Sequence, residues 1–291
     1  MEIIINGIKT NYQVFGEGPS PTNFGLKENK NVKSVTGSKL VGDKPFLILH
    51  GWGSNSERWQ EVGEFLAEKG LKVIIPDMPG FGKSDIPETP WNFNNYVSWA
   101  EKFAENLNLE NFCLLGHSFG GAIAVKITVN TPQKISKLFL VSSACIRKRT
   151  GLKNILAKLS KIVKIFSFLP YYLLFRKAFY KFVIRKSDYI YTEGVMKETY
   201  LKAISEDLSH YLSFIKSPSV IIWGDKDEST PIENAYFINK KIKNSKLVII
   251  SGAGHNLNRK SPHILAEKII ENLSPEKRDK NPALYAKYMG K

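Results

Sequence analysis

Ser118 stands in the pattern G-H-S-F-G at residues 116–120. A serine hydroxyl attacks a carbonyl carbon efficiently when a base accepts its proton and nearby N–H groups stabilise the charge that forms. The apolar run 112–115 precedes the pattern, and a helix of small residues is predicted to begin near Gly121. The glycines leave room for a sharp turn between strand and helix, in which we expect Ser118 at a strained, positive φ. This arrangement is typical of a nucleophile elbow and predicts acyl-transfer chemistry.

A base and a carboxylate follow later in the chain. His255 comes directly after the loop that follows the last predicted strand, where it could take the proton from Ser118. Asp225 and Asp227 follow the preceding strand. A carboxylate there could hold the tautomer of His255, and both aspartates qualify by position.

The other four histidines fit the role of base less well. His50 reads as a turn residue whose ring bonds to nearby backbone, and His117 is held within the elbow. His210 lies in or beside a predicted cap, and His263 begins the last predicted helix. We therefore expect structural roles for all four.

Two backbone N–H groups could stabilise an oxyanion. The apolar strand 46–49 ends in His-Gly-Trp-Gly, and Gly51 lets the backbone turn so that the N–H of Trp52 points at the same space as that of Phe119. Two such donors form an oxyanion hole. The indole of Trp52 could equally be only a packed aromatic.

Apolar strands alternate with helical segments along most of the chain, which predicts an α/β fold with a doubly wound, mostly parallel sheet. Ligands bind such sheets beyond the carboxyl ends of the strands. The predicted strands are 2–5, 10–15, 46–49, 71–76, 112–115, 137–142, 219–223 and 246–250, with a helix at 94–106.

Two segments interrupt this alternation. Residues 17–44 are rich in Gly, Ser, Asn, Lys and Pro, which predicts a flexible surface insertion. Residues 146–207 are predicted to form a basic helical cap (lid), because 147–186 hold about twelve Lys and Arg with no Asp or Glu around amphipathic apolar faces. Its apolar faces could pack on the core with the lysines in solvent. Alternatively, they could line an acyl cleft whose basic rim attracts an acidic carrier protein or an anionic membrane surface.

Composition narrows the classes of function. The chain has 291 residues, a net charge of +15 and two cysteines, Cys113 and Cys145, which we expect to be buried and unpaired. The start of the chain lacks a signal-peptide pattern, so the expected location is cytoplasmic, with peripheral membrane attachment possible through the basic segment. We expect no cofactor, because the glycine-rich stretch 77–85 lacks phosphate-loop spacing, and no metal, because no two histidines stand at ligand spacing. We found no nucleic-acid-binding motif.

The order Ser118, Asp227, His255 resembles that of the α/β-hydrolase superfamily. The resemblance implies two core parts, 1–145 and 208–291, separated by the 146–207 cap, and it assigns Asp227 as the acid and Asp225 as structural. The pairing of HGWG with GHSFGG resembles the carboxylesterase branch that includes pimeloyl-[acyl-carrier protein] methyl ester esterases. The segments that carry the resemblance are LHGWG (49–53), DMPGFGKSD (77–85), GHSFGG (116–121), WGDKD (223–227) and GAGH (252–255).

The sequence thus predicts a serine carboxylesterase acting on short to medium acyl chains, with catalytic Ser118, Asp227 and His255 and oxyanion donors Trp52 and Phe119. Its substrate would be a small or carrier-bound acyl ester. Two alternatives remain: a membrane-surface lysophospholipase or monoacylglycerol lipase, and a catalytically silent ligand-binding protein of the same fold.

Overall fold

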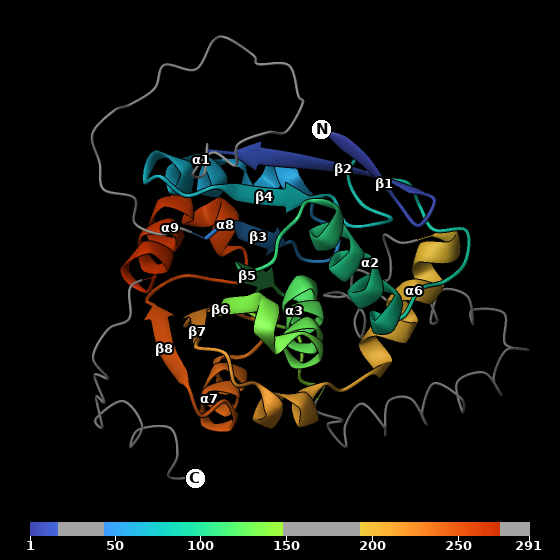
Figure 1. The fold of residues 1–291 in the computed structure, drawn as a ribbon. Coiled ribbons are helices and arrows are strands. Elements are labelled where there is room, and N and C mark those ends of the chain that lie inside the picture. The colour runs from blue at the N-terminus through green and yellow to red at the C-terminus, as the bar shows by residue number, and fades with distance from the viewer. Residues whose placement is uncertain (17–43, 148–192, 274–291) are drawn as a thin grey trace, which may run out of the picture.

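A computed structural model describes residues 1–16, 44–147 and 193–273 (Figure 1). Within these residues, eight strands form one sheet in the order β1-β2-β4-β3-β5-β6-β7-β8. β2 runs antiparallel to β1 and β4, and the remaining neighbours are parallel. The strands are β1 (Glu2–Ile5), β2 (Ile8–Phe15), β3 (Phe46–Leu49), β4 (Val73–Pro76), β5 (Phe112–His117), β6 (Ile135–Val141), β7 (Ser219–Gly224) and β8 (Ser245–Ile250).

The predicted doubly wound, mostly parallel sheet is therefore confirmed. The described α-helices are α1 (Gln60–Glu68), α2 (Phe93–Asn106), α3 (Phe119–Asn130), α6 (Gly194–Ser205), α7 (Ile232–Lys241), α8 (Leu257–Lys260) and α9 (Pro262–Glu271). Short 3-10 helices are η1 (Ser56–Trp59), η2 (Pro132–Lys134) and η4 (Ser209–Phe214).

The sheet separates two apolar cores because neighbouring side chains on a strand point to opposite faces. On β3, Leu47 and Leu49 enter one core, together with residues of α2, α3 and α7. Phe46 and Ile48 enter the other core, together with residues of α1, α8 and α9, which lie next to one another in Figure 1. Since β3 is buried on both faces, it is a continuous apolar run rather than an alternating one.

Local turn chemistry explains the first hairpin. Asn6 and Gly7 join β1 to β2 with φ angles of 52° and 80°, a left-handed conformation that Asn and Gly tolerate better than other residues. Cys113 and Cys145 are free and buried, as expected.

Several predictions fall on residues that the structure does not describe. These are the flexible insertion, of which Lys44 alone is described, most of the basic cap, and the polar tail from Ser274. Of the predicted cap, Ile146, Arg147 and residues 193–207, which include α6, are described. None of the helices within the described ranges combines the length and apolar character needed to cross a bilayer.

The contact between the end of β3 and the start of α3 leaves no room for a side chain at position 120. A Cβ there would lie 2.6 Å from the carbonyl oxygen of His50 and even closer to that of Leu49, both of which are backbone atoms. We expect Gly120→Ala to lower the free energy of unfolding by at least about 2 kcal/mol, because backbone must move to relieve the overlap.

Urea unfolding would measure this loss. Gly254→Ala is the matched control, since the nearest atom to a Cβ there is the carbonyl oxygen of Lys226 at 3.7 Å, an ordinary contact. Equal stability of the two variants would contradict the steric explanation.

Candidate active site

A single residue makes the turn between β5 and α3. Ser118 has φ 50° and ψ −112°, which confirms the expected positive φ. The predicted boundaries were wrong here: the strand does not stop at Leu115, and the helix begins at Phe119 rather than near Gly121. The strand extends because Gly116 and His117 still pair with β6.

Backbone hydrogen bonds on both sides hold Ser118 in this conformation. Its N–H donates to the carbonyl of Val141 at 3.0 Å, and its carbonyl accepts from the N–H of Ala144 at 2.9 Å. Both partners lie at the end of β6 or just beyond it. The neighbouring strand therefore stabilises the strained φ at Ser118.

Ser118, His255 and Asp227 form one line of hydrogen-bonding side chains. The Oγ of Ser118 lies 3.0 Å from Nε2 of His255, and Nδ1 of His255 lies 2.9 Å from Oδ2 of Asp227. A carboxylate only accepts, so Nδ1 carries the proton and Nε2 is free to accept from the serine hydroxyl. The side chain of Asp227 is 0% exposed and that of His255 is 18% exposed. The three predicted residues thus meet beyond the carboxyl ends of β5, β7 and β8.

Asp227 is held by its own loop as well as by His255. Its Oδ1 accepts from the backbone N–H groups of Ser229 at 2.9 Å and Thr230 at 2.8 Å, the pattern of an Asx turn. Burial alone would raise the pKa of Asp227. The hydrogen bond and charge of His255, together with the bonds from Thr230, outweigh burial and bring this pKa below its ordinary value. The carboxylate is therefore ionised at neutral pH.

Asp225, the other aspartate that qualified by position, points elsewhere. Its Oδ1 accepts from the N–H of Gly252 at 2.7 Å, and its Oδ2 lies 3.4 Å from Oγ of Ser251. It therefore ties the loop after β7 to the loop after β8, and the structural role that the family resemblance implied agrees with these contacts.

His50 is buried and bonded on both ring nitrogens. The N–H of Met78 donates to Nε2 at 3.0 Å, so Nδ1 must carry the proton, and it donates to the carbonyl of Gly51 at 2.8 Å. Burial lowers the pKa of His50 to about 4, although the bond to Gly51 opposes this shift. The interpretation of His50 as a turn residue bonded to nearby backbone is confirmed.

His117 is also buried, and it contacts the loop that carries His255. Its Nε2 lies 3.0 Å from the carbonyl oxygen of His255, so this nitrogen must be the protonated one. The two rings are 5.0 Å apart between centroids. Burial, and to a lesser degree the nearby His255, lower the pKa of His117 to about 3. The neutral imidazole of His117 thus holds the backbone of His255 through this hydrogen bond.

The two predicted oxyanion donors lie on neighbouring segments. The N–H of Gly120 donates to the carbonyl of His50 at 3.1 Å, which joins the end of β3 to the start of α3. The ring of Trp52 packs against that of Phe119 at 5.2 Å and that of Phe81 at 4.9 Å. It also contacts Tyr200 of α6, at 5.1 Å. The indole of Trp52 is therefore a packed aromatic, independently of any role of its backbone N–H as an oxyanion donor.

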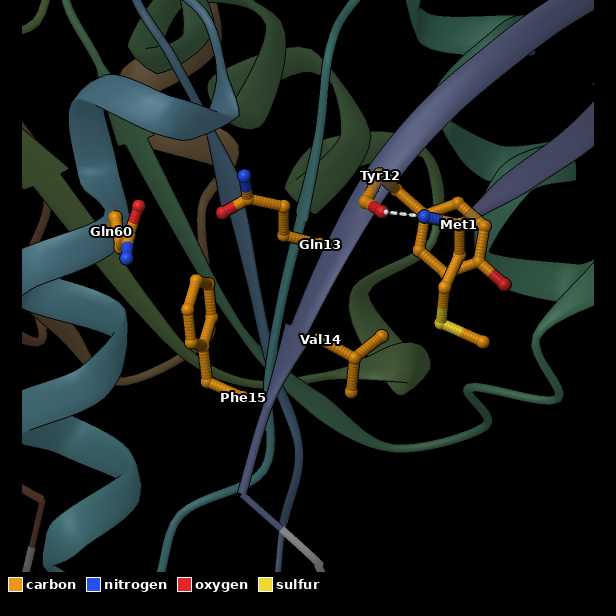
Figure 2. A pocket seen from close by; sticks show the side chains of 6 residues that line it. All are labelled: Met1, Tyr12, Gln13, Val14, Phe15 and Gln60. Carbon is orange, nitrogen blue, oxygen red and sulfur yellow. Dashed lines mark hydrogen bonds between the residues drawn. The ribbon is translucent and has the colours of Figure 1, made fainter. Parts of the chain in front are cut away.

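A separate hollow of about 340 Å³ lies beside β2 and the start of α1, as Figure 2 shows. Its lining includes no serine, histidine or carboxylate, and it shares no residue with the Ser118 site. We therefore assign it no part in the chemistry. The lining residues are Met1, Tyr12, Gln13, Val14, Phe15 and Gln60.

Comparison with known proteins identifies the family to which this fold belongs. The family model described as "alpha/beta hydrolase fold" matches residues 44–163 and 165–261. The chain belongs to the α/β-hydrolase family.

Esterases and lipases are among the relatives of this α/β-hydrolase. Lipase 1 of Psychrobacter immobilis is 26% identical, with 79% of this chain and 80% of the lipase covered. Monoacylglycerol lipase ABHD6 of Homo sapiens is 25% identical, with 80% and 76% covered. The solved structure of an esterase from Exiguobacterium antarcticum superposes with a TM-score of 0.67 at 22% identity, over 94% of this chain and 98% of the esterase, and shows a shared fold.

Sequence reasoning missed one residue of the α/β-hydrolase site. Thr230 contacts Asp227 through both its backbone N–H and its hydroxyl, and the hydroxyl oxygen also lies 3.3 Å from Nδ1 of His255. The available signal was its spacing: a threonine three residues after an aspartate in a turn can reach back to the carboxylate.

The two buried histidines predict a loss of stability in mild acid. An unfolded histidine has a pKa near 6.5, above the folded values for His50 and His117. The unfolded chain therefore binds more protons between about pH 6.5 and 4, and stability falls as the pH falls through that window. From pH 7 to pH 5 we expect urea unfolding to show a loss of about 2 kcal/mol for each histidine. The lowered pKa of Asp227 affects stability only at pH values below this range.

Variants would assign this effect to its residues. His117→Phe should remove about half of the loss between pH 7 and pH 5, whatever its stability at pH 7. Ile264→Ala changes an exposed side chain of α9 that carries no titratable group and serves as the control, with an unchanged pH dependence expected. A wild-type pH dependence in His117→Phe would contradict the assignment.

Proposed function

We propose that this α/β-hydrolase is a serine hydrolase that cleaves carboxylic esters through an acyl-enzyme. The observation that carries the proposal is the unbroken line from Ser118 Oγ to His255 and on to the buried carboxylate of Asp227, with separations of 3.0 and 2.9 Å. A nucleophile, a base and a group that holds the base are the three parts such a reaction needs.

Each residue then has a defined task. His255 Nε2 takes the hydroxyl proton as Ser118 Oγ bonds to the ester carbonyl carbon, and it returns that proton to the leaving alcohol as the C–O bond breaks. Water, deprotonated by His255, attacks the acyl-enzyme and releases the acid and Ser118. Asp227 stays ionised and stabilises the imidazolium that forms in each half-reaction.

The proposed oxyanion donors are the N–H groups of Trp52 and Phe119. Phe119 is the first residue of α3, where backbone N–H groups lack partners within the helix. The carbonyl of Gly51 accepts from His50 and from the N–H of Ser54 at 3.1 Å. Because a trans peptide directs its N–H opposite to its carbonyl, the N–H of Trp52 points away from those partners. That leaves both donors for the oxyanion.

Replacing Ser118 with alanine is the direct test. Ser118→Ala should lower kcat/KM for p-nitrophenyl esters at least about a thousandfold, because the acyl-enzyme cannot form. Ser213→Ala, which removes an exposed hydroxyl on η4, is the matched control and should keep wild-type activity. A folded Ser118→Ala protein with wild-type kcat/KM would contradict the proposal. A fluorophosphonate that labels neither the wild type nor the variant would favour a silent binding protein.

A second candidate is a lipase that acts on monoacylglycerol or lysophospholipid at a membrane surface. The similarity to monoacylglycerol lipase ABHD6 and to Lipase 1 favours it. A p-nitrophenyl ester series from acetyl to dodecanoyl separates the two candidates. A peak at short to medium chains supports the carboxylesterase, and a long-chain peak supports the lipase.

The partner that presents the ester is a finer proposal. The basic segment 147–186 would suit an acidic acyl carrier protein, as in the pimeloyl-ester branch, or an anionic membrane, but all of it except Arg147 lies outside the described residues. A methyl ester on an acyl carrier protein, and anionic vesicles at low and high salt, would test these two partners.

A further inference from the structure

Thr230 lies between two members of the Ser118 site. It stands in the loop after β7, two residues before α7, and is 7% exposed. The buried indole of Trp223 donates from Nε1 to the carbonyl of Thr230 at 2.8 Å. This bond holds the backbone of Thr230 from the β7 side, so its side chain has a defined position relative to Asp227.

The hydroxyl of Thr230 has one proton and three polar neighbours. Oγ1 lies 2.8 Å from Oδ2 of Asp227 and 3.3 Å from the carbonyl oxygen of Ser142. It lies 3.3 Å from Nδ1 of His255, which carries its own proton and so donates. The carboxylate is both nearer and charged, and charge-assisted hydrogen bonds are the stronger ones. The hydroxyl proton therefore goes to Asp227.

Oδ2 of Asp227 thus accepts from Thr230 and from His255 at once, while Oδ1 accepts from two backbone N–H groups. Every side of the carboxylate is occupied, and rotation would break several bonds together. The donation from Thr230 also draws negative charge away from the oxygen that faces His255.

We propose that Thr230 is a positioning residue of this site: its hydroxyl fixes Oδ2 of Asp227 toward His255 and moderates the basicity of the Asp227–His255 pair. The inference rests on the proposed function, since it concerns the base that activates Ser118. It differs from a packing role, in which the methyl group of Thr230 would matter and the hydroxyl would not.

The sign of the pH effect follows from the contacts. Without the hydroxyl, the carboxylate of Asp227 holds more charge for the imidazolium of His255. The apparent pKa of the pair, read from the acidic limb of kcat/KM, should then rise. Within the described chain, the titratable side chains in contact with His255 are Asp227 and His117. His117 stays neutral across the assay range, because burial brings its pKa to about 3.

Two substitutions separate the hydroxyl from the methyl group. Thr230→Val keeps the shape and loses the hydroxyl. It should lower kcat about tenfold with little change in KM, and move the acidic limb up by about half a pH unit. Thr230→Ser keeps the hydroxyl and loses the methyl group. Its kcat and the pH of its acidic limb should therefore stay close to those of the wild type. The reverse ranking, or a Thr230→Val limb at the wild-type pH, would overturn the inference.

The rate of Ser118 phosphonylation by a fluorophosphonate provides a readout independent of the natural ester. A wild-type protein that is not labelled would contradict the proposed function itself. Labelling of the wild type, with equal rates and equal pH profiles in Thr230→Val, would contradict the role of Thr230 alone. Slower labelling in Thr230→Val than in Thr230→Ser is the expected result. Circular dichroism and urea unfolding would show that both variants are folded.

Discussion

The contact between the end of β3 and the start of α3 is the constraint on which the site depends. The N–H of Gly120 reaches the carbonyl of His50 at 3.1 Å only because residue 120 has no side chain. This approach joins the segment that carries Trp52 to the start of α3, where the ring of Phe119 packs against that of Trp52. Gly51 makes a second close approach, since a Cβ added there would lie 2.9 Å from Nδ1 of His117 and 3.3 Å from the Cβ of Ser118. Close packing of backbone at Gly51 and Gly120 therefore helps to position Ser118.

Two buried, neutral histidines, His50 and His117, lie in the region of the candidate site, and His117 contacts His255. His50 and His117 are buried, and each uses a protonated nitrogen to bind a backbone carbonyl, that of Gly51 and that of His255 respectively. A charged imidazole at either position would be costly to bury, and one at position 117 would also repel a charged His255. Burial thus keeps His50 and His117 neutral, with their rings held by hydrogen bonds to backbone carbonyls, whereas His255 is partly exposed.

The described part of the predicted cap region is bonded to the core near this site. Thr199 of α6 accepts from the N–H of Trp91 at 3.0 Å, and Tyr200 packs on Trp52. Just after α6, Glu206 pairs at 2.8 Å with Lys126, whose side chain is 5% exposed on α3. Breaking this pair would leave the buried ammonium of Lys126 without its carboxylate, so the contact resists separation of the end of α6 from α3. The segment made of α6 and Glu206 therefore contacts both the ring of Trp52 and α3, the helix that begins at Phe119.

The sequence by itself determined the features that depend on neighbouring residues. Alternating apolar strands and helices indicated the sheet, because the periodicity of apolar residues reflects which side chains are buried. The small residues around Ser118 indicated a turn with positive φ, because glycines leave room for it. The end of β5 was misjudged, since pairing of Gly116 and His117 with β6 continues the strand, and a local pattern does not contain that partner.

The tertiary structure gives the physical reason for a choice between carboxylates that position in the sequence left open and that only the family resemblance made. Asp225 accepts from the N–H of Gly252, whereas Asp227 faces His255. Thr230 gains its place from contacts with Asp227, Trp223 and the loop that carries His255. The hydrogen-bond partners of Asp225, Asp227 and Thr230 depend on how the ends of β7 and β8 lie side by side. Hydrogen bonds between loops distant in sequence require defined positions in space, and composition and spacing do not specify those positions.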